Sequence, residues 1–470
     1  MLENRSFDHM LGFSGLSGTD AATGQPTKIN GLDGTENNVF DGKEYPVIQG
    51  ADFRMDFDPG HEFTDVVQQL CGPNAKYPLG GPYPAIDNSG FVASYVAIGG
   101  TANPGEIMKC YAPAQLPVLN ALACDFVVCD NWYSSVPGPT WPNRMFVHAA
   151  SSSGLDHSPS TDEILQWETL AGFQFKNGNI FDALNNAGIK RRLYGGDDFP
   201  MVSALKGIHF GDIRHFTLFA SDLHRSSFDS SYVFIEPSYD ILHDYRAGTS
   251  QHPLGDVTQG EALIKVTYES IRNSPVWESS LLIITWDEHG GFFDHVAPPP
   301  APPPGDTRLD SPNNRNGFAF DRYGPRVPAI VVSPLIPRGL IDHRVYDHAS
   351  IPATIESIFG LKPLTARDAQ ANRLDALVTL DAPRQDARET LPAPAVNAAP
   401  ADRPNDSVND GNLPGLLHAA LQQDLALSPG RRVEILARVA AIKVRDEAML
   451  YLAEVQHKLR QHLDATRTRG

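Results

Sequence analysis

Cysteine is scarce in this chain: only Cys71, Cys110, Cys124 and Cys129 occur among 470 residues. No two of them form a CxxC pair, which excludes a zinc ribbon and a thioredoxin-type redox motif. Cys124 and Cys129 flank a short apolar run, and we expect both to be buried as small hydrophobic residues. A disulfide between Cys71 and Cys110 has no support from the sequence.

Positive charge is also in short supply, and long hydrophobic runs are missing. Lys and Arg number 38 against 56 Asp and Glu, which gives a net charge of −18. A nucleic-acid partner is disfavoured because a phosphate backbone needs a basic surface. A small phosphorylated substrate is not excluded, since a bound cation can invert the local field. No run of 18 apolar residues predicts a membrane span, and no signal-peptide pattern starts at Met1. As written, the sequence predicts a cytoplasmic protein.

Apolar strand-like runs alternate with helix-like runs along most of the chain. The strand-like runs are residues 126–129, 192–195, 232–235, 281–285 and 329–332. The helix-like runs are residues 63–70, 116–123, 180–186, 261–272 and 351–359. Strands that alternate with helices predict an α/β fold with a doubly wound, mostly parallel sheet.

The composition changes near residue 380. Residues 381–412 are rich in Pro and Ala and predict a flexible linker, which leaves residues 1–380 as the main α/β domain. Residues 413–470 carry apolar side chains mainly at helical spacing and predict a small helical appendage. We favour packing of these helices on the main domain, with oligomerisation or contact with a membrane surface as alternatives.

The densest group of ionisable side chains directly follows the apolar run 281–285. Its members are Asp287, Glu288, His289, Asp294 and His295. Ligands of open α/β sheets bind beyond the carboxyl ends of the strands, and Gly290 and Gly291 let the backbone turn sharply there. Crowded carboxylates repel one another unless a cation or protons hold them. This stretch predicts a metal-assisted hydrolytic site, and its oxygen ligands favour one divalent ion, Ca²⁺, Mg²⁺ or Mn²⁺.

A rigid turn rich in Pro and Gly, residues 134–144, follows the run 126–129. It places Thr140 at a strand-to-helix turn, where backbone N–H groups and the helix dipole suit a phosphate. A hydroxyl there can act as a nucleophile when a metal lowers its pKa, and Arg144 could fork onto phosphate oxygens. The alternative makes Thr140 a helix cap and Arg144 half of a surface ion pair. This stretch alone favours the cap, because capping threonines are far commoner than nucleophiles.

Further oxygen donors and histidines lie elsewhere in the chain. Glu3 and Asn4 are adjacent oxygen donors that suit a hard cation. His61 and His252 each lie near a turn-forming proline. Lone histidines are usually structural, but these two are candidates for a general acid or base, or for phosphate contacts.

Taken together, these motifs resemble a known family over about residues 1–375. The matching segments appear in the family's order: 3–9, 58–61, 138–144, 234–237, 252–253, 287–295, 346–348 and 359–361. The chain resembles the phosphoesterase family of bacterial phosphatidylcholine-preferring phospholipases C, plant non-specific phospholipases C and a respiratory-burst-inhibiting acid phosphatase.

The resemblance implies an alkaline-phosphatase-like fold with a serine or threonine nucleophile, which corresponds to Thr140. It implies metal ligands at Glu3, Asn4, Thr140, Asp287 and Glu288. It implies active-site histidines at His61, His252 and His295, with His289 and Asp294 less securely placed. Either His252 or His295 would protonate the leaving alcohol, while His61, Asn143 and the helix N-terminus would hold phosphate oxygens.

A threonine at the nucleophile position is more similar to the phospholipase C branch than to the acid phosphatase. The resemblance therefore implies cleavage of phospholipids through a phosphothreonine intermediate, with a broad phosphomonoesterase as the alternative. A degenerate, non-enzymatic binding protein is the third hypothesis. In relatives a hydrophobic first strand precedes the segment that begins at Glu3, and Met1 and Leu2 correspond to its end. A longer N-terminus could carry an export signal, and the compartment would then be periplasmic or extracellular.

Overall fold

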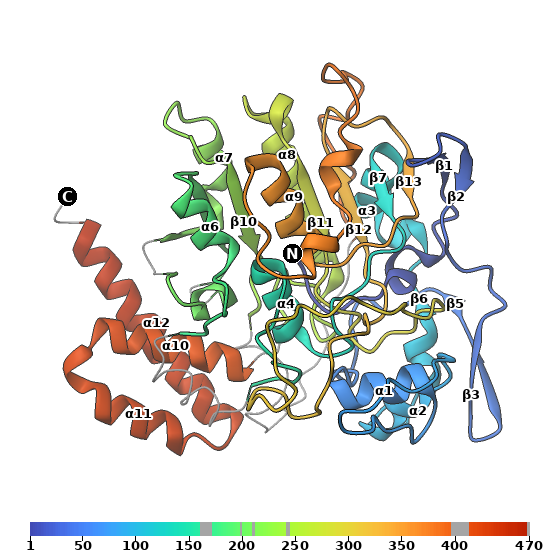
Figure 1. Ribbon diagram of the computed structural model, residues 1–470, viewed down its shortest axis with the longest axis horizontal. Helices are drawn as coiled ribbons and strands as arrows, with labels where there is room; N and C mark the ends of the chain where they lie inside the picture. The colour runs from blue at the N-terminus through green and yellow to red at the C-terminus, as the bar shows by residue number, and fades with distance from the viewer. Residues whose placement is uncertain (160–171, 198–199, 209–211, 241–244, 396–412, 468–470) are drawn as a thin grey trace.

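The computed structural model describes residues 1–159, 172–197, 200–208, 212–240, 245–395 and 413–467. Strands stand side by side through the middle of the molecule, with helices packed around them, and the C-terminal helices lie at one side (Figure 1). None of the described helices is long and apolar enough to cross a membrane. All four cysteines are free thiols; Cys129 is buried as expected, whereas Cys124 is exposed.

The larger sheet has six strands in the order β11-β12-β7-β13-β1-β2. They are β11 (Leu282–Thr285), β12 (Ala329–Val332), β7 (Val127–Cys129), β13 (Leu340–Asp342), β1 (Ser17–Asp20) and β2 (Pro26–Lys28). β13 runs parallel to both β7 and β1, whereas β12 is antiparallel to β11 and β7, and β2 is antiparallel to β1. The strands β7 and β12 are buried along their whole length, as their apolar sequences require.

A second, fully parallel sheet has the order β10-β8-β9. Its strands are β10 (Tyr232–Glu236), β8 (Arg191–Gly195) and β9 (Ile213–His215). Two small pairs lie apart from both sheets: β3 (Asn37–Phe40) with β4 (Lys43–Pro46), and β5 (Ile48–Gln49) with β6 (Lys109–Cys110).

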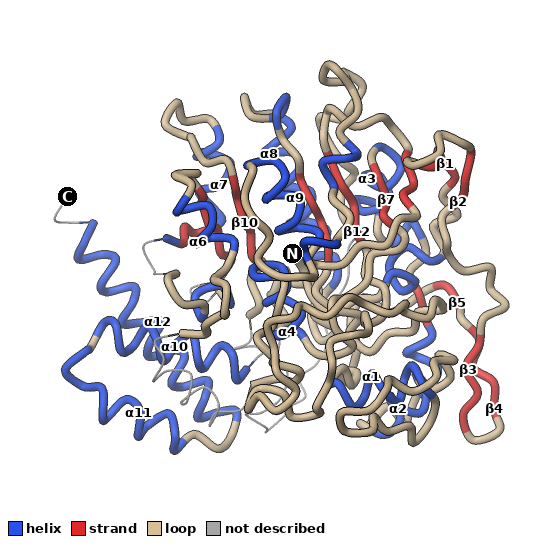
Figure 2. The backbone as a smooth tube through the Cα atoms, in the orientation of Figure 1, coloured by secondary structure: helices blue, strands red, loops and turns tan. Residues whose placement is uncertain are grey.

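The first two residues of the chain lie between the two sheets, which Figure 2 draws in red. Leu2 pairs with Trp286 in the parallel sense: its N–H donates to Thr285 O at 2.9 Å, and its carbonyl accepts from Asp287 N–H at 3.3 Å. The amino group of Met1 reaches Ile235 O of β10 at 3.2 Å. A cavity of about 600 Å³, lined by β10, β11, α8 and α9, lies beside this contact.

The described α-helices of the main domain are α1 (Phe63–Cys71), α2 (Phe91–Ala97), α3 (Pro117–Asp125), α4 (Thr140–Ala149), α6 (Ile180–Asn186), α7 (Phe219–Leu223), α8 (Val257–Arg272) and α9 (Ser350–Phe359). Several of them have local sequence signals at their ends, and α2 and α7 were not predicted. The Asp256 side chain accepts the N–H of Thr258 and so caps α8. Helix α9 ends at Gly360, whose φ of +65° favours glycine.

The predicted α/β fold is confirmed, and every predicted strand and helix of the main domain forms within a few residues of its expected bounds. The sheet is mixed rather than purely parallel because β12 reverses direction. Three C-terminal helices follow: α10 (Leu413–Leu427), α11 (Arg432–Ala441) and α12 (Arg445–Arg467). The flexible linker predicted for residues 381–412 is wrong in its first part, because residues 381–395 pack on α8: Leu391 is buried, and its carbonyl accepts from Lys265 Nζ at 2.7 Å. Its second part, residues 396–412, lies outside the described residues.

Candidate active site

Thr140 is the first residue of α4, and its side chain is only 2% exposed. The preceding turn, residues 136–139, is fixed by Asn143, whose amide donates to the carbonyls of Val136, Gly138 and Pro139. The N-cap residue is Pro139, which offers no side-chain cap to the first N–H groups of the helix. The positive end of α4 is therefore free to face an anion beside the Thr140 hydroxyl.

Asn4 is the hydrogen-bond partner of this hydroxyl. Thr140 Oγ1 donates to Asn4 Oδ1 at 3.1 Å, and the backbone N–H of Asn4 donates to Asp287 Oδ1 at 2.9 Å. Asn4 is fully buried with a φ of +56°, a left-handed conformation that asparagine tolerates better than most residues. A Cβ added to Gly290 would lie 2.0 Å from the carbonyl oxygen of Asn4, so only glycine fits against this turn.

Arg144 is occupied by protein groups and does not face an open space. Its Nε donates to Asp287 Oδ2 at 2.9 Å, and its other nitrogens reach Glu236 Oε1 at 3.4 Å and the carbonyl of Leu2 at 3.1 Å. The guanidinium is 4% exposed and lies over the ring of Tyr239. Arg144 therefore orients Asp287, in place of the phosphate contact expected from the sequence.

Glu288 lies beside two histidines, and all three side chains are buried. Burial raises the pKa of Glu288 to about 8, although the neighbouring His61 acts to lower it. Burial alone would lower the pKa of His61, but the carboxylates of Glu288, Asp58 and Glu62 outweigh it and raise this pKa to about 10. The carboxylates around His61, Glu288 among them, thus favour its protonated, positively charged form.

His289 has one ring nitrogen committed to the protein and one available. Its Nε2 lies 2.8 Å from Gln69 Oε1, an acceptor, so Nε2 carries the proton. Its Nδ1 faces Glu288 Oε2 at 3.3 Å without a hydrogen bond. Burial, and then the charge of His61, lower the pKa of His289 to about 3. The neutral ring therefore presents a lone pair toward Glu288.

His252 pairs with Asp58, the carboxylate that also acts on His61. Its Nδ1 accepts the N–H of Leu254 at 3.3 Å, and its Nε2 lies 3.4 Å from Asp58 Oδ2. The ring is fully buried and stacks on Tyr245 with a centroid distance of 3.6 Å. This arrangement directs an Nε2 proton toward Asp58, the carboxylate that can act as counter-ion to this ring.

The buried polar atoms of this region fit a hard cation. Within the described residues, the carboxylate oxygen Glu288 Oε1 is buried without a hydrogen-bond partner, and so is the amide nitrogen Asn4 Nδ2, a donor that suits an anion and not a cation. Glu3, Asp287 and Glu288 are fully buried carboxylates on adjoining loops, and each prefers a compensating charge. Both oxygens of Asp287 are already engaged by N–H groups and Arg144, whereas Glu288 keeps Oε1 without a hydrogen-bond partner.

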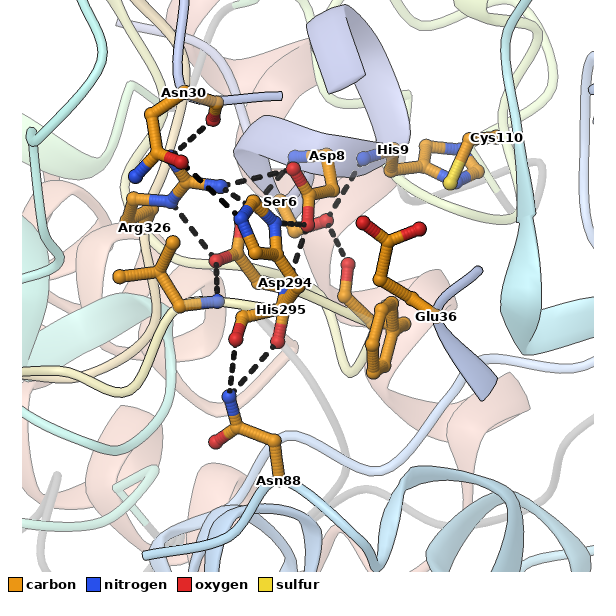
Figure 3. A network of polar contacts seen from close by, with 12 residues as sticks. Ser6, Asp8, His9, Asn30, Glu36, Asn88, Cys110, Asp294, His295 and Arg326 are labelled. Atoms are coloured by element: carbon orange, nitrogen blue, oxygen red, sulfur yellow. Dashed lines mark hydrogen bonds and ion pairs between the residues drawn. The ribbon is translucent and has the colours of Figure 1, made fainter. Parts of the chain in front are cut away.

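A second acidic group, the Arg326 cluster (Asp8, Asp294, His295 and Arg326), lies elsewhere (Figure 3). Arg326 donates to Asp8 Oδ1 at 2.8 Å and to Asp294 Oδ1 at 2.9 Å, and His295 Nδ1 lies 2.7 Å from Asp8 Oδ2. In the described parts of the chain, only Asp8, Asp294 and His295 form a group of three such ligands within 4.8 Å. A guanidinium already supplies the positive charge that a metal would bring there.

His295 therefore bonds to Asp8 and Asn30, and Asp294 accepts from Arg326, so neither side chain reaches Thr140. This differs from the roles in acid catalysis and substrate binding expected for them. Two buried residues outside the predicted set support the Thr140 region: His348 Nε2 lies 2.5 Å from the carbonyl of Asp287, and Gln69 holds His289. The segment 346–348 already pointed to His348, whereas no sequence signal marked Gln69.

Comparisons with known proteins agree with this geometry. The model of the Phosphoesterase family matches residues 1–362. Non-specific phospholipase C3 of Arabidopsis thaliana is 35% identical over 408 residues, which cover 83% of this chain and 74% of that protein. Non-specific phospholipase C6 of the same plant is 36% identical over 417 residues, with the same coverage. Phospholipase C B of Mycobacterium tuberculosis is 28% identical over 445 residues, which cover 85% of this chain and 80% of that protein.

Solved structures with a similar chain trace are more distant. A protein in the alkaline phosphatase superfamily from Vibrio parahaemolyticus has a TM-score of 0.36 and 15% identity, and the match covers 55% of this chain and 64% of that one. The phosphonate monoester hydrolase of Agrobacterium radiobacter has a TM-score of 0.34 and 13% identity, with 57% and 73% coverage. These scores are too low to support an inference, so the expected family resemblance is confirmed by the sequence matches alone.

Proposed function

The chain belongs to the Phosphoesterase family, and we propose that it is a phosphodiesterase of the phospholipase C type with Thr140 as its nucleophile. It would cleave a phospholipid between the glycerol oxygen and phosphorus, and release diacylglycerol and a phosphorylated head group. The relatives named as phospholipases C favour a diester substrate over a phosphomonoester. The observation that carries the proposal is the contact of Thr140 Oγ1 with Asn4 at the uncapped end of α4.

Attack by Thr140 needs the hydroxyl proton to leave, and an amide oxygen is too weak a base to take it. A divalent cation held by Glu3, Asn4 and Glu288 would lower the pKa of the Thr140 hydroxyl and polarise a phosphoryl oxygen. The metal site is a proposal, and its support is the set of buried carboxylates together with the unpartnered oxygen of Glu288.

The reaction has two displacements at phosphorus. Thr140 Oγ1 forms a bond to phosphorus while the bond to the glycerol oxygen breaks, which yields phosphothreonine. His252 would give a proton to the departing alkoxide from its doubly protonated form, with Asp58 as the counter-ion, because a neutral ring that lost its Nε2 proton would become an anion. Water next displaces Thr140 from phosphorus, and His252 accepts the proton of that water.

The test compares phosphatidylcholine vesicles with p-nitrophenyl phosphate for the whole chain and for two variants. Thr140→Val should abolish release of phosphocholine, and wild-type protein should prefer the diester. Thr101→Val is the matched control, because Thr101 is exposed at the surface. A folded Thr140→Val protein with most of its activity would refute the covalent mechanism. A preference for the monoester would support the phosphatase alternative.

A further inference from the structure

The turn that carries His252 is held by one arginine, Arg5, whose side chain is fully buried. Its Nε donates to the carbonyl of Gln251 at 2.8 Å, and its Nη2 donates to the carbonyl of His252 at 3.3 Å. Two nitrogens of one planar group therefore fix two successive peptide carbonyls. A lysine does not reproduce this arrangement, because its ammonium is a point charge on a flexible stem.

The other side of the guanidinium is fixed as well. Arg5 Nη1 lies 3.0 Å from His9 Nε2. The Nδ1 of His9 lies 2.9 Å from the carbonyl of Lys109, so Nδ1 carries the proton and Nε2 accepts from Arg5. Burial, and then the charge of Arg5, lower the pKa of His9 well below its usual value, which keeps this ring neutral. The ring also stacks on Phe292 at a centroid distance of 3.8 Å. Arg5 is therefore clamped between His9 and the turn.

Gln251, the residue before His252, has a backbone that needs such support. Its φ is +70°, in the left-handed region that residues other than glycine rarely adopt. Its side chain is held at both polar atoms: Oε1 accepts from Trp286 Nε1 at 2.9 Å, and Nε2 donates to the carbonyl of Val257 at 2.8 Å. A Cβ added to Gly260 would lie 2.1 Å from Gln251 Cγ, so the packing there is tight. A strained backbone persists only where its surroundings over-determine it, and here it sets the direction in which the chain presents His252.

The same arginine joins this turn to the proposed nucleophile. Arg5 directly follows Asn4, whose side-chain oxygen accepts the hydroxyl of Thr140 at 3.1 Å. The backbone N–H of Arg5 donates to the carbonyl of Glu288 at 3.0 Å. The backbone of Arg5 thus lies on the nucleophile side of the site, whereas its side chain reaches the turn of His252.

We propose that Arg5 is a positioning residue that fixes the place of His252 relative to Thr140. The inference rests on the proposed function, because it assigns the consequence of these contacts to the proton that His252 gives to the departing alkoxide. Each nitrogen of the guanidinium bonds to the protein, so Arg5 acts through the carbonyls of Gln251 and His252. Its loss should slow only the reactions whose leaving group needs that proton.

The experiment compares two diester substrates of the whole chain that differ in their leaving group. Phosphatidylcholine releases an alkoxide, which needs a proton, whereas p-nitrophenyl phosphorylcholine releases p-nitrophenolate, which is stable without one. The measured quantity is kcat/KM, because it reports only the steps up to the release of the first product. Arg5→Lys should lower kcat/KM on phosphatidylcholine by about 10²-fold, within the range of general acid catalysis, and on p-nitrophenyl phosphorylcholine by less than about threefold.

Arg272→Lys is the matched control. Arg272 also donates to a backbone carbonyl through two nitrogens, at 3.2 and 3.1 Å from Ala387 O, but it lies at the opposite end of α8 from Val257. It should match wild type on both substrates. Gln251→Met removes both polar contacts of that side chain without a change of charge. It should show the same selective loss as Arg5→Lys, and it decides the question if Arg5→Lys does not fold.

Two results would overturn the inference. One is wild-type kcat/KM on phosphatidylcholine in a folded variant of the turn, and the other is an equal loss on both substrates, which a general disturbance of the site would give. Circular dichroism checks that each variant is folded. His252→Asn separates the outcome from the proposed function. Full activity of His252→Asn on phosphatidylcholine would refute the proposed acid itself, whereas a selective loss that Arg5→Lys does not share would remove only the role of Arg5.

Discussion

The hydroxyl of Thr140 donates a 3.1 Å hydrogen bond to the side-chain oxygen of Asn4, a residue 136 positions away in the sequence. Asn4 in turn is held by Asp287, and Asp287 by Arg144. This chain of contacts joins the start of the polypeptide, the start of α4 and the end of β11 at one point. Its members are buried, so each hydrogen bond is shielded from competing water.

Removal of the Asn4 side chain should disable the site without unfolding the protein. Asn4→Gly keeps the φ of +56° free of strain and deletes only the acceptor of the Thr140 hydroxyl. We expect kcat to fall by about 10²-fold, the size seen when a single oriented polar group is lost. The free energy of unfolding should fall by about 1–3 kcal/mol, from the unmade buried hydrogen bond. Steady-state kinetics and urea titration measure the two effects; an unchanged kcat would contradict the role of Asn4.

We expect a metal ion to bind beside Glu288 and not at the Arg326 cluster. Glu288→Gln should weaken binding of Mn²⁺, measured by calorimetry, and abolish reactivation after EDTA treatment, because Glu288 Oε1 is an unpartnered buried oxygen. Asp294→Asn should leave metal binding intact but destabilise the fold, because Asp294 is a buried partner of Arg326. The reverse pattern would place the ion at the Arg326 cluster.

A bulky residue at position 415 should separate α10 from Trp141. Gly415→Val would place its side chain inside the indole ring, so the helix must shift. We expect lower thermal stability and a loss of activity that exceeds the fraction unfolded, because Trp141 directly follows Thr140. Ala420→Val, in the same helix and in the buried apolar cluster that includes Trp141 but five residues further along α10, is a control for overpacking alone. Tm and kcat of the two variants give the comparison; equal activity losses would argue against a specific role for the Trp141 contact.

Glu356 should make stability depend on pH. Burial, together with the hydrogen-bonded carboxylate of Asp368, raises the pKa of Glu356 to about 9. Asp368 accepts backbone N–H groups of Leu364 and Thr365, so Glu356 is the protonated partner. The folded state then holds a proton that the unfolded state has lost above its ordinary pKa near 4.5. Stability should fall as pH rises from about 4.5 to 9, by at most about 1.4 kcal/mol per pH unit.

Glu356→Gln provides the check, because an amide can donate to Asp368 at every pH. The Tm of the variant relative to wild type should rise steadily between pH 5 and about 9. A difference in Tm that does not vary with pH would contradict protonation of Glu356 in the folded protein.

The cavity between β10 and β11 should accept an added strand. Its walls combine apolar side chains with strand edges, and Leu2 already pairs with Trp286 as the end of a parallel strand would. Burial lowers the pKa of the Met1 amino group to about 5, and a peptide bond there would remove this ionisable group. About six Val and Ile residues fused ahead of Met1 should therefore raise Tm by several degrees. A fused Ser-Asn segment of equal length is the control, and an equal effect of both would refute the prediction.

Local sequence was sufficient for the elements of the fold. The apolar run 329–332 forms β12 with those bounds, and residues 180–186 form α6, because strand and helix preferences are set by neighbours in the chain. The reversal of β12 escaped prediction, since the direction of a strand depends on the path of the loops between strands. The short strands β1 and β13 were also missed, because three or four residues carry little periodic signal.

The sequence by itself determined which reactive side chains are present and their local positions: a hydroxyl at a helix start, neighbouring carboxylates after β11 and histidines beside prolines. Only the tertiary structure decided how these groups are paired. Arg144 binds Asp287, and His295 binds Asp8, because buried charges take the partners that long-range packing brings within hydrogen-bond distance. The contact between the C-terminal helices and Trp141 was decided in the same way, since it joins residues more than 270 positions apart through shape and not through any shared sequence pattern.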